Sequence, residues 1–339
     1  MASVAGMDLP LPKARPDRIL VLGDTGCRIT SGELQDCNDP AKWPFPSVAA
    51  AAAKLHPDLV IHVGDFLYRE SACPYGNAGC AGSPWGDNWP TWAADFFTPA
   101  APLLAVAPWV MVRGNHEACN RAGAGHARLL GQDAVAACAD HAAVYTIDLG
   151  GLTLAVMDDA AAPDTEVNRT MLPVFASELA GLAGLPAPVW FVHHRPVWSP
   201  ISGPLNIPVG GNRTLIAAAG DTLIPATVQL MLSGHIHAFQ AINYDGEVPP
   251  QIVAGHGGDT LHRTPRNLKG AIFQGRSGVT VKDGLSVGGF GFLLFIRAGN
   301  DWSIDLYDPD GGLRGQCRLA AATDGEKPRV SCPALTPSK

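Results

Sequence analysis

The chain has 339 residues, of which 47% are hydrophobic, so it is long enough to bury the core of one large domain or two small ones. Its formal charge of −7 provides no global positive field, which argues against a dedicated nucleic-acid partner. No transmembrane helix is predicted, because Gly, Pro or Asp interrupts every apolar stretch. A small anionic ligand remains compatible with this composition, since a bound metal would supply local positive charge.

Short runs rich in β-branched residues alternate along the chain with alanine-rich segments. Each run ends at a glycine or a polar cluster, which is typical of strands buried on both faces. Strands are predicted at residues 18–22, 59–63, 109–112, 144–148, 153–157, 189–192, 228–232, 292–297 and 302–307. Helices are predicted at residues 46–55 and 176–182. This alternation predicts an α/β fold.

Two pairs of neighbouring strands are close enough in the sequence to form hairpins, namely 144–148 with 153–157 and 292–297 with 302–307. Neither an internal repeat nor a linker-like stretch interrupts the pattern. We therefore predict one domain over residues 15–339, preceded by an N-terminal extension over residues 1–14.

The eight cysteines fall into four pairs of sequence neighbours: Cys27 with Cys37, Cys73 with Cys80, Cys119 with Cys138, and Cys317 with Cys332. Eight cysteines allow 105 pairings, and the clustering favours the local one. A structural zinc site would need closely spaced cysteine pairs, which are absent. We therefore predict disulfides and an oxidising compartment, either periplasmic or secreted. The first ten residues do not resemble a signal peptide, which is expected if a leader has been removed.

Five polar clusters follow predicted strands: Gly23-Asp24-Thr25-Gly26, Gly64-Asp65-Phe66-Leu67-Tyr68, Gly114-Asn115-His116-Glu117, His193-His194 and Gly234-His235-Ile236-His237. The carboxyl ends of strands form the ligand-binding rim of an open α/β sheet, so these clusters are expected to meet. Asp, Asn, His and Tyr supply mixed oxygen and nitrogen donors, which suit iron, zinc or manganese better than calcium. The preceding glycines are expected to let the backbone turn sharply. Each cluster alone has an ordinary alternative as a turn or a core residue.

Taken together, the clusters resemble the calcineurin-like metallophosphoesterase superfamily, and the tyrosine makes them most similar to the purple acid phosphatases. The pattern of that family is GDxG, GDxxY, GNH[ED], VxxH and GHxH. This chain has GDTG, GDFLY, GNHE, a strand into His193-His194, and GHIH, over about residues 19–240. The resemblance implies a layered α/β sandwich with two central mixed β-sheets flanked by helices. It also implies that two metal ions serve as cofactors.

Carried over residue by residue, the resemblance implies seven metal ligands: Asp24, Tyr68 and His237 at a first position, Asn115, His194 and His235 at a second, and Asp65 bridging both. A tyrosine ligand implies Fe(III) at the first position with a divalent zinc, iron or manganese ion at the second. A di-zinc or di-manganese site is the alternative. For Tyr68 itself, the alternative is a core aromatic residue below the site.

Further residues near the clusters are candidates for catalysis and substrate binding. The resemblance implies that His116 is the acid that protonates the leaving group, oriented by Glu117 or by a backbone group. The alternative for Glu117 is a supporting residue behind the metal ligands. His193 is a candidate second donor, with a half-buried structural residue as the alternative. Four weaker candidates for contacting phosphate follow motif residues or a predicted strand: Arg69, Arg121, Arg195 and His256. For the arginines, surface salt bridges are the competing interpretation.

The predicted function is hydrolysis of phosphate monoesters by in-line attack of hydroxide at the two metals, with a small phosphate ester as the partner. A phosphodiesterase or nucleotide pyrophosphatase acting at the same metals is the alternative, because one metal frame supports all these reactions. A binding module that keeps the fold without catalysis is a third possibility. It is less favoured because every inferred ligand is present.

Overall fold

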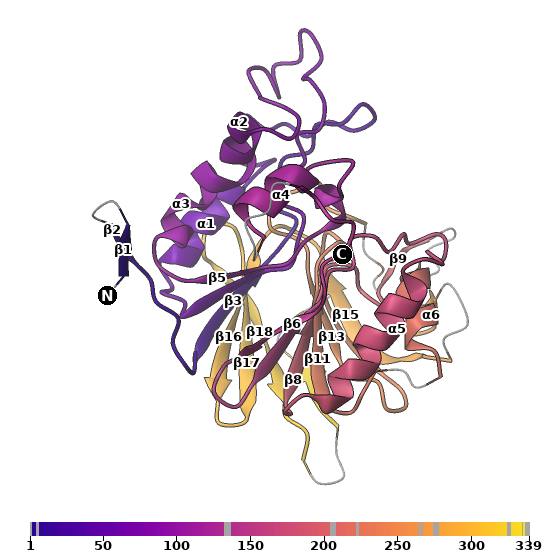
Figure 1. Ribbon diagram of the computed structural model, residues 1–339. Helices are drawn as coiled ribbons and strands as arrows, with labels where there is room; N and C mark the ends of the chain where they lie inside the picture. The colour runs from indigo at the N-terminus through magenta and orange to yellow at the C-terminus, as the bar shows by residue number, and fades with distance from the viewer. Residues whose placement is uncertain are drawn as a thin grey trace.

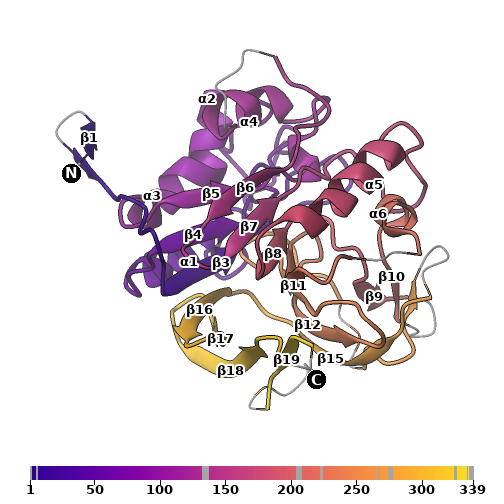
Figure 2. The ribbon, with the colours of Figure 1, turned by 60° about the horizontal axis from the view of Figure 1, so that its bottom comes forward.

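The computed structural model describes residues 2–4, 7–131, 137–203, 208–221, 224–263, 265, 267–273, 278–323, 327–333 and 335. Within these residues, two seven-stranded β-sheets lie face to face, and helices cover the outer side of each sheet (Figures 1 and 2). Both sheets are mixed. The fold is therefore the layered α/β sandwich with two central mixed sheets that the resemblance implied.

The first sheet carries three of the motif loops. Its strand order is β19 (Arg329–Ser331), β18 (Leu313–Ala320), β17 (Asp301–Tyr307), β16 (Phe292–Ala298), β3 (Arg18–Leu22), β4 (Leu59–His62) and β5 (Trp109–Met111). Strands β3, β4 and β5 are parallel, so their carboxyl ends share one edge. The predicted hairpin at 292–297 and 302–307 is confirmed as the antiparallel pair β16 and β17.

The second sheet carries the two histidine motifs. Its strand order is β15 (Val281–Val287), β12 (Phe239–Tyr244), β13 (Gln251–Ala254), β11 (Val228–Ser233), β8 (Val189–Val192), β7 (Thr153–Val156) and β6 (Tyr145–Asp148). Strands β7, β8, β11 and β13 are parallel. The predicted hairpin at 144–148 and 153–157 is confirmed as β6 and β7.

The helices are α1 (Phe45–Ala53), α2 (Trp89–Trp92), α3 (Thr98–Leu104), α4 (Gly123–Leu129), α5 (Leu172–Gly181) and α6 (Arg213–Ala219), with short helical turns at Ala93–Phe97, Asn115–Glu117 and Leu182–Gly184. The helix predicted at 46–55 is α1. The helix predicted at 176–182 begins four residues earlier, at Leu172, because a proline in the first turn, Pro173, is compatible with a helix start.

The apolar core has three layers, which explains why the motif strands are hydrophobic on both faces. Ile19 and Val21 of β3 pack between the two sheets, whereas Leu20 and Leu22 pack under the outer helices α1 and α3. A third cluster lies under α5 and α6. Successive side chains of a strand point to opposite faces, so a strand between two apolar layers must be apolar throughout.

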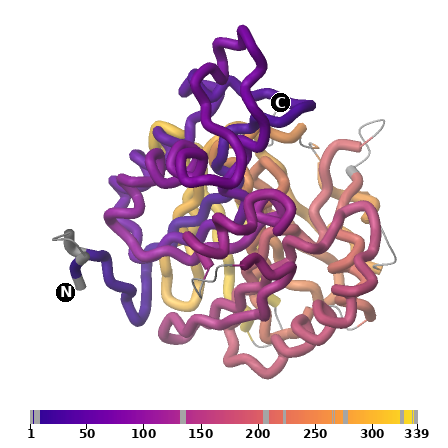
Figure 3. Tube along the Cα trace, turned by 45° about the horizontal axis from the view of Figure 1, so that its top comes forward, coloured from indigo at the N-terminus to yellow at the C-terminus, as the bar shows by residue number. Residues whose placement is uncertain are grey.

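All eight cysteines form the four predicted local disulfides, Cys27–Cys37, Cys73–Cys80, Cys119–Cys138 and Cys317–Cys332. The first two brace the loops that follow β3 and β4. These loops lie side by side, as Figure 3 shows, and are joined by hydrogen bonds from Asn38 to residues 78–81. Four disulfides are typical of an oxidising compartment.

Two small β-structures complete the described chain. Strands β14 (Ile272–Phe273), β10 (Pro208–Gly210) and β9 (Pro200–Ser202) form a three-stranded sheet, and β1 (Ala2–Val4) pairs with β2 (Met7–Leu9) in a hairpin that stands away from the body (Figure 1). None of the helices in the described residues is long and apolar enough to cross a membrane.

Candidate functional site

Three predicted ligands of the first metal position meet at the edge where β3 and β4 end. The Tyr68 hydroxyl lies 3.1 Å from Asp24 Oδ1 and 3.1 Å from His237 Nε2, and these last two atoms are 3.3 Å apart. Donor atoms at about 2.0–2.2 Å from one metal, at right angles to each other, are about 3 Å apart. The three side chains therefore have the spacing of ligands to a single ion.

Asp65 connects this group to the ligands predicted for the second position. Its Oδ2 atom lies 3.0 Å from the Tyr68 hydroxyl and 3.1 Å from His194 Nε2. His194 Nε2 is in turn 3.2 Å from Asn115 Oδ1. Donor atoms of Asp65, His194 and His235 lie within 4.8 Å of one another. One carboxylate oxygen thus faces both groups, as a bridging ligand requires.

Each of the three histidines is oriented by an oxygen on its outer side. Nδ1 of His194 lies 2.8 Å from the Val63 carbonyl, and Nδ1 of His237 lies 2.6 Å from the Thr260 carbonyl. For His235 the outer nitrogen is Nε2, which lies 2.7 Å from Asp164 Oδ2. Such outer hydrogen bonds fix the tautomer and the ring orientation of metal-binding histidines. The sequence did not predict the role of Asp164.

The charges at this site favour a cation. Burial alone would raise the pKa of Asp65, but His194 and His116 hold it well below its usual range. Burial would likewise lower the pKa of His194 and His237, yet nearby carboxylates raise these values to about 10 and about 9. The buried carboxylates therefore concentrate negative potential where the seven predicted ligands meet. The donor set fits a pair of metal ions on these grounds.

Three of the predicted ligands adopt the left-handed backbone conformation, with φ of 55° at Asp24, 59° at Asp65 and 66° at His235. Non-glycine residues rarely adopt this conformation, and where they do it is often at functional sites. Of the glycines before these ligands, Gly64 has a positive φ of 99°. Gly114 was predicted to let the backbone turn sharply, but it is needed for another reason. A Cβ atom at this position would fall on the Asp65 carboxylate.

Glu117 holds the motif loops together and does not orient His116, which favours the second of its two predicted roles, support behind the ligands. Its buried carboxylate accepts hydrogen bonds from backbone N–H groups of Asp65, Phe66, Leu67 and Gly114, at 2.8–3.1 Å. Burial and the charge of Asp65 raise the pKa of Glu117 to about 8. The Glu117 side chain is occupied with these backbone groups.

Two further buried carboxylates, which the sequence did not identify, fix other motif loops. Asp95 accepts hydrogen bonds from the backbone N–H groups of Cys27 and Tyr68, at 3.1 and 2.8 Å. Asp159 accepts hydrogen bonds from those of His194 and Arg195. The loops of the first, second and fourth motifs are therefore each held by a carboxylate from another part of the chain.

His116 is oriented by Glu70 and Arg121. Its Nδ1 atom lies 2.8 Å from Glu70 Oε1, and Arg121 Nη2 lies 2.6 Å from the same nitrogen while also pairing with Glu70. Arg121 is only a donor, so Glu70 is the acceptor for a proton on Nδ1. The other nitrogen, Nε2, lies 4.0 Å from Asp65 Oδ2, and the ring packs against Tyr68 with centroids 3.7 Å apart.

Three predicted candidates lie elsewhere. His193 is fully buried, stacks on Phe191 and directs Nδ1 to Asp159 at 3.0 Å, so it is a core residue. The Arg69 side chain is turned to the buried Asp95, with 2.6 Å between Nε and Oδ1. His256 is fully buried, and burial lowers its pKa to about 3. We therefore withdraw His193 as a catalytic residue and Arg69 and His256 as contacts to phosphate.

The two other predicted arginines lie beside the site but are held by carboxylates. Arg121 pairs with Glu70, as described above. Nη1 of Arg195 lies 2.6 Å from Asp164 Oδ2 and 3.3 Å from His235 Nε2. Both arginines therefore support residues that face the site.

A cavity of about 410 Å³ opens over the ligand cluster. Five of the predicted site residues line it: Asp65, Asn115, His116, His235 and His237. The wall also includes Arg28, Asp164 and His262, which the sequence did not indicate. This volume is in the range of small-molecule sites.

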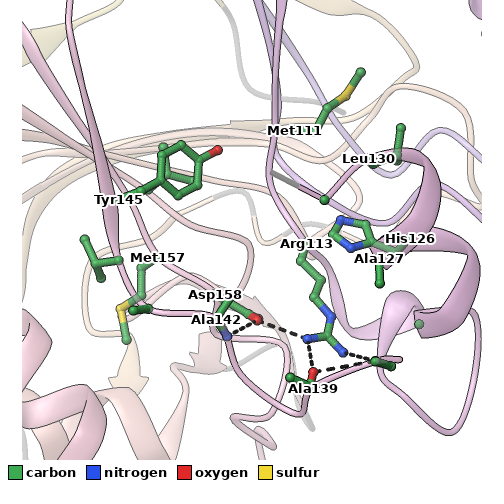
Figure 4. Close-up of a pocket in the computed structure, with 16 residues that line it drawn as sticks. Met111, Arg113, His126, Ala127, Leu130, Ala139, Ala142, Tyr145, Met157 and Asp158 are labelled. Carbon is green, nitrogen blue, oxygen red and sulfur yellow. Dashed lines mark hydrogen bonds and ion pairs between the residues drawn. The ribbon is translucent and has the colours of Figure 1, made fainter. Parts of the chain in front are cut away.

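A second cavity, of about 500 Å³, is lined by residues of α4 and of the segments at the ends of β5 and β7 (Figure 4). Its lining is largely apolar, with an ion pair of 3.1 Å between Arg113 Nη1 and Asp158 Oδ2. None of the predicted site residues is among the described residues that line it. The predicted site residues therefore belong to the cavity of about 410 Å³ and not to this one.

A family model described as calcineurin-like phosphoesterase matches residues 17–239, which is more than half of the chain. The chain belongs to the calcineurin-like phosphoesterase family. The match covers all five motifs, so the phosphoesterase assignment rests on the segment that builds the ligand cluster. No curated protein sequence matches the chain significantly.

Solved structures of other proteins share the fold. PhoD has a TM-score of 0.57 at 12% identity, with 97% of this chain and 74% of PhoD covered. Purple acid phosphatase PPD1 from yellow lupin (Lupinus luteus) seeds has a TM-score of 0.52 at 15% identity, with 91% and 54% covered. GAP50, described as the anchor in the inner membrane complex of Plasmodium, has a TM-score of 0.50 at 15% identity, with 94% and 90% covered.

At sequence identities of 12–15%, these comparisons show only that this chain shares the fold of the three structures. The chain spans about half the length of the lupin phosphatase. Because one of these structures is described as an anchor, the fold by itself does not assign catalysis to this chain.

Proposed function

We propose that this chain is a dinuclear metallophosphatase that hydrolyses small phosphate monoesters. The observation that carries the proposal is the convergence of seven donor residues on two adjoining groups that share Asp65 Oδ2. Mixed carboxylate, amide, phenol and imidazole donors suit iron, zinc or manganese. The family assignment supports phosphate-ester chemistry at the same residues.

In this proposal, the first ion is held by Asp24, Tyr68 and His237, the second by Asn115, His194 and His235, and both by Asp65. Bound there, the ions would neutralise phosphate oxygens and supply an activated water near neutral pH. The phenol of Tyr68 favours Fe(III) at the first position, with zinc, iron or manganese at the second. A di-zinc or di-manganese pair is the alternative.

His116 is the proposed general acid. The acceptor Glu70, at 2.8 Å, binds Nδ1–H of the protonated ring, whose second proton, on Nε2, is the one available for transfer. His116 would donate this proton to the oxygen of the leaving alcohol, and Glu70 would stabilise the charged ring before transfer. The His116 side chain is 7% exposed, so bulk water does not compete readily for the proton.

The charges around the cavity favour a substrate with a single phosphate group. The arginines at or beside the site are each paired with a carboxylate: Arg28 with Asp259, Arg121 with Glu70, and Arg195 with Asp164. None of these three arginines is therefore without a carboxylate partner. This supports a monoester over a phospho-anhydride.

We also propose that residues 15–339 form a single catalytic domain, with residues 1–14 as an extension. The four disulfides support a periplasmic or secreted location.

The test compares hydrolysis of 4-nitrophenyl phosphate with that of bis(4-nitrophenyl) phosphate by metal-loaded protein, using metal-stripped protein as the control. We expect kcat/KM to be at least about tenfold higher for the monoester, which corresponds to about 1.4 kcal/mol of transition-state binding. A preference for the diester would identify a phosphodiesterase. Turnover of neither ester by protein that carries both metals would contradict catalysis and favour a binding module.

A further inference from the structure

A segment outside the five motifs forms one wall of the cavity. Residues 255–262 follow β13 and cross the loop of the first motif, with hydrogen bonds from Gly257 N to Gly23 O at 3.0 Å and from Asp259 N to Asp24 O at 2.9 Å. A Cβ atom at Gly257 would lie 2.6 Å from Gly23 O, so this close crossing depends on glycine. The segment thereby brings Asp259 and His262 beside the first-position ligands.

Arg28 is held against this wall by a fully buried carboxylate. Its Nε atom lies 3.1 Å from Asp259 Oδ1, and Nη2 also pairs with Asp259. The guanidinium carbon is 4.8 Å from the centroid of the Tyr68 ring. Arg28 lines the cavity, and its remaining nitrogen, Nη1, has no hydrogen-bond partner among the described residues. Arg28 therefore lies beside the metal ligands and has an Nη1 group that Asp259 does not engage.

His262 offers a second donor in a defined tautomer. Its Nδ1 atom accepts a hydrogen bond from the backbone N–H of His237 at 3.0 Å, and the two imidazole rings stack with centroids 4.3 Å apart. A nitrogen that accepts an N–H carries no proton, so the neutral ring has its proton on Nε2. The ring lines the same cavity as Arg28.

We propose that Arg28 and His262 bind the phosphate group of the substrate and select monoesters over diesters. This inference rests on the proposed function. A monoester has one more non-bridging oxygen and one more ionisable charge than a diester, and N–H donors outside the metal-ligand set recognise that additional oxygen. Arginine is particularly suited to binding phosphate oxygens because its planar guanidinium presents several donors. A diester places an alkoxy group where a monoester offers an acceptor, so these donors lose a partner.

The experiment uses metal-loaded wild-type protein, Arg28→Met and His262→Ala. Calorimetric titration with inorganic phosphate measures binding, and kcat/KM for the mono- and diester measures selectivity. Each substitution is expected to weaken phosphate binding about 10- to 100-fold, the range for losing a hydrogen bond to a charged group. The ratio of monoester to diester kcat/KM is expected to fall at least about tenfold.

Controls separate recognition from folding. Arg28→Met leaves the buried Asp259 without its partner, so metal content and thermal unfolding are measured for each variant. His262→Ala leaves Asp259 paired but removes a ring that contacts His237, so its metal content is decisive, while His262→Gln retains an N–H donor and should keep much of the binding. Arg128→Met, at an exposed position of α4, should bind phosphate like the wild type.

Wild-type phosphate binding by both Arg28→Met and His262→Ala, with metals retained, would overturn the inference. If wild-type protein still hydrolysed the monoester, the proposed function would survive that result. Equal losses on monoester and diester would also overturn the proposed selectivity. If the wild type turned over neither ester, the proposed function would fail, and the phosphate titration would still decide whether these residues bind the anion.

Discussion

Replacing His116 by glutamine is expected to lower kcat for an alkyl phosphate by about 10²- to 10⁴-fold, the usual contribution of a general acid. The expectation follows from the position of the residue, which lines the cavity and has Nδ1 held by Glu70 at 2.8 Å. An alkoxide leaving group is a strong base and needs this proton. 4-Nitrophenolate is a weak base, so the same variant should lose much less activity on 4-nitrophenyl phosphate.

The comparison of leaving groups distinguishes a general acid from a residue that only binds phosphate. Equal losses on both substrates would contradict the assignment of His116 as the acid. Glu70→Gln is the companion variant, and we expect a smaller loss with the same dependence on the leaving group, because Glu70 acts through His116. Metal content should match the wild type in both variants, since neither residue belongs to the predicted ligand set.

Asp65→Asn is expected to reduce the metal content from about two ions per chain to one or fewer and to abolish measurable turnover. Asp65 Oδ2 lies 3.0 Å from the Tyr68 hydroxyl and 3.1 Å from His194 Nε2, so both positions depend on one carboxylate oxygen. Asparagine removes the charge that offsets two cations. Elemental analysis and competition with a chelator measure the loss.

Asp164→Asn provides the matched control, because Asp164 meets the predicted ligands at the outer nitrogen of His235 and otherwise pairs with Arg195 and Asn212. Loss of such an outer partner typically weakens metal affinity about 10- to 100-fold. The effect of Asp65→Asn should be larger and should extend to both positions. Full retention of two ions by Asp65→Asn would contradict its assignment as the bridging ligand.

The central strands could be predicted because both of their faces are buried and their sequences are continuously apolar. Strand β12 was missed for the opposite reason. It contains Gln240 and Asn243, which are buried and satisfied by hydrogen bonds to Pro200 and Val330 from other parts of the chain. Polar residues whose partners come from elsewhere interrupt the apolar pattern by which sequence reasoning recognises a strand.

The ligand cluster could be predicted because each ligand belongs to a short motif at a strand end. Its supporting residues could not, because their partners are remote. Arg28 and Asp259 are 231 residues apart, and Glu70 and Arg121 are 51 residues apart. Spacing along the chain does not indicate which carboxylate will meet which arginine.

The incorrect assignment of His193 has a related cause. His193 and His194 are consecutive at the end of β8, and neighbouring side chains of an extended segment point to opposite sides. His194 faces the ligand cluster, whereas His193 faces the core beside Phe191. Two adjacent histidines therefore indicate a site without showing that both take part in it.

The metal content of the purified protein, measured together with its visible absorption spectrum, tests the central claim most directly. We predict about two metal ions per chain, with iron among them and a broad visible band arising from the Tyr68 phenolate. Two ions per chain without a visible band would support the dinuclear site but exclude Fe(III) bound to Tyr68. Near-zero metal in protein never exposed to a chelator, with no uptake on incubation with iron, zinc or manganese, would contradict the account.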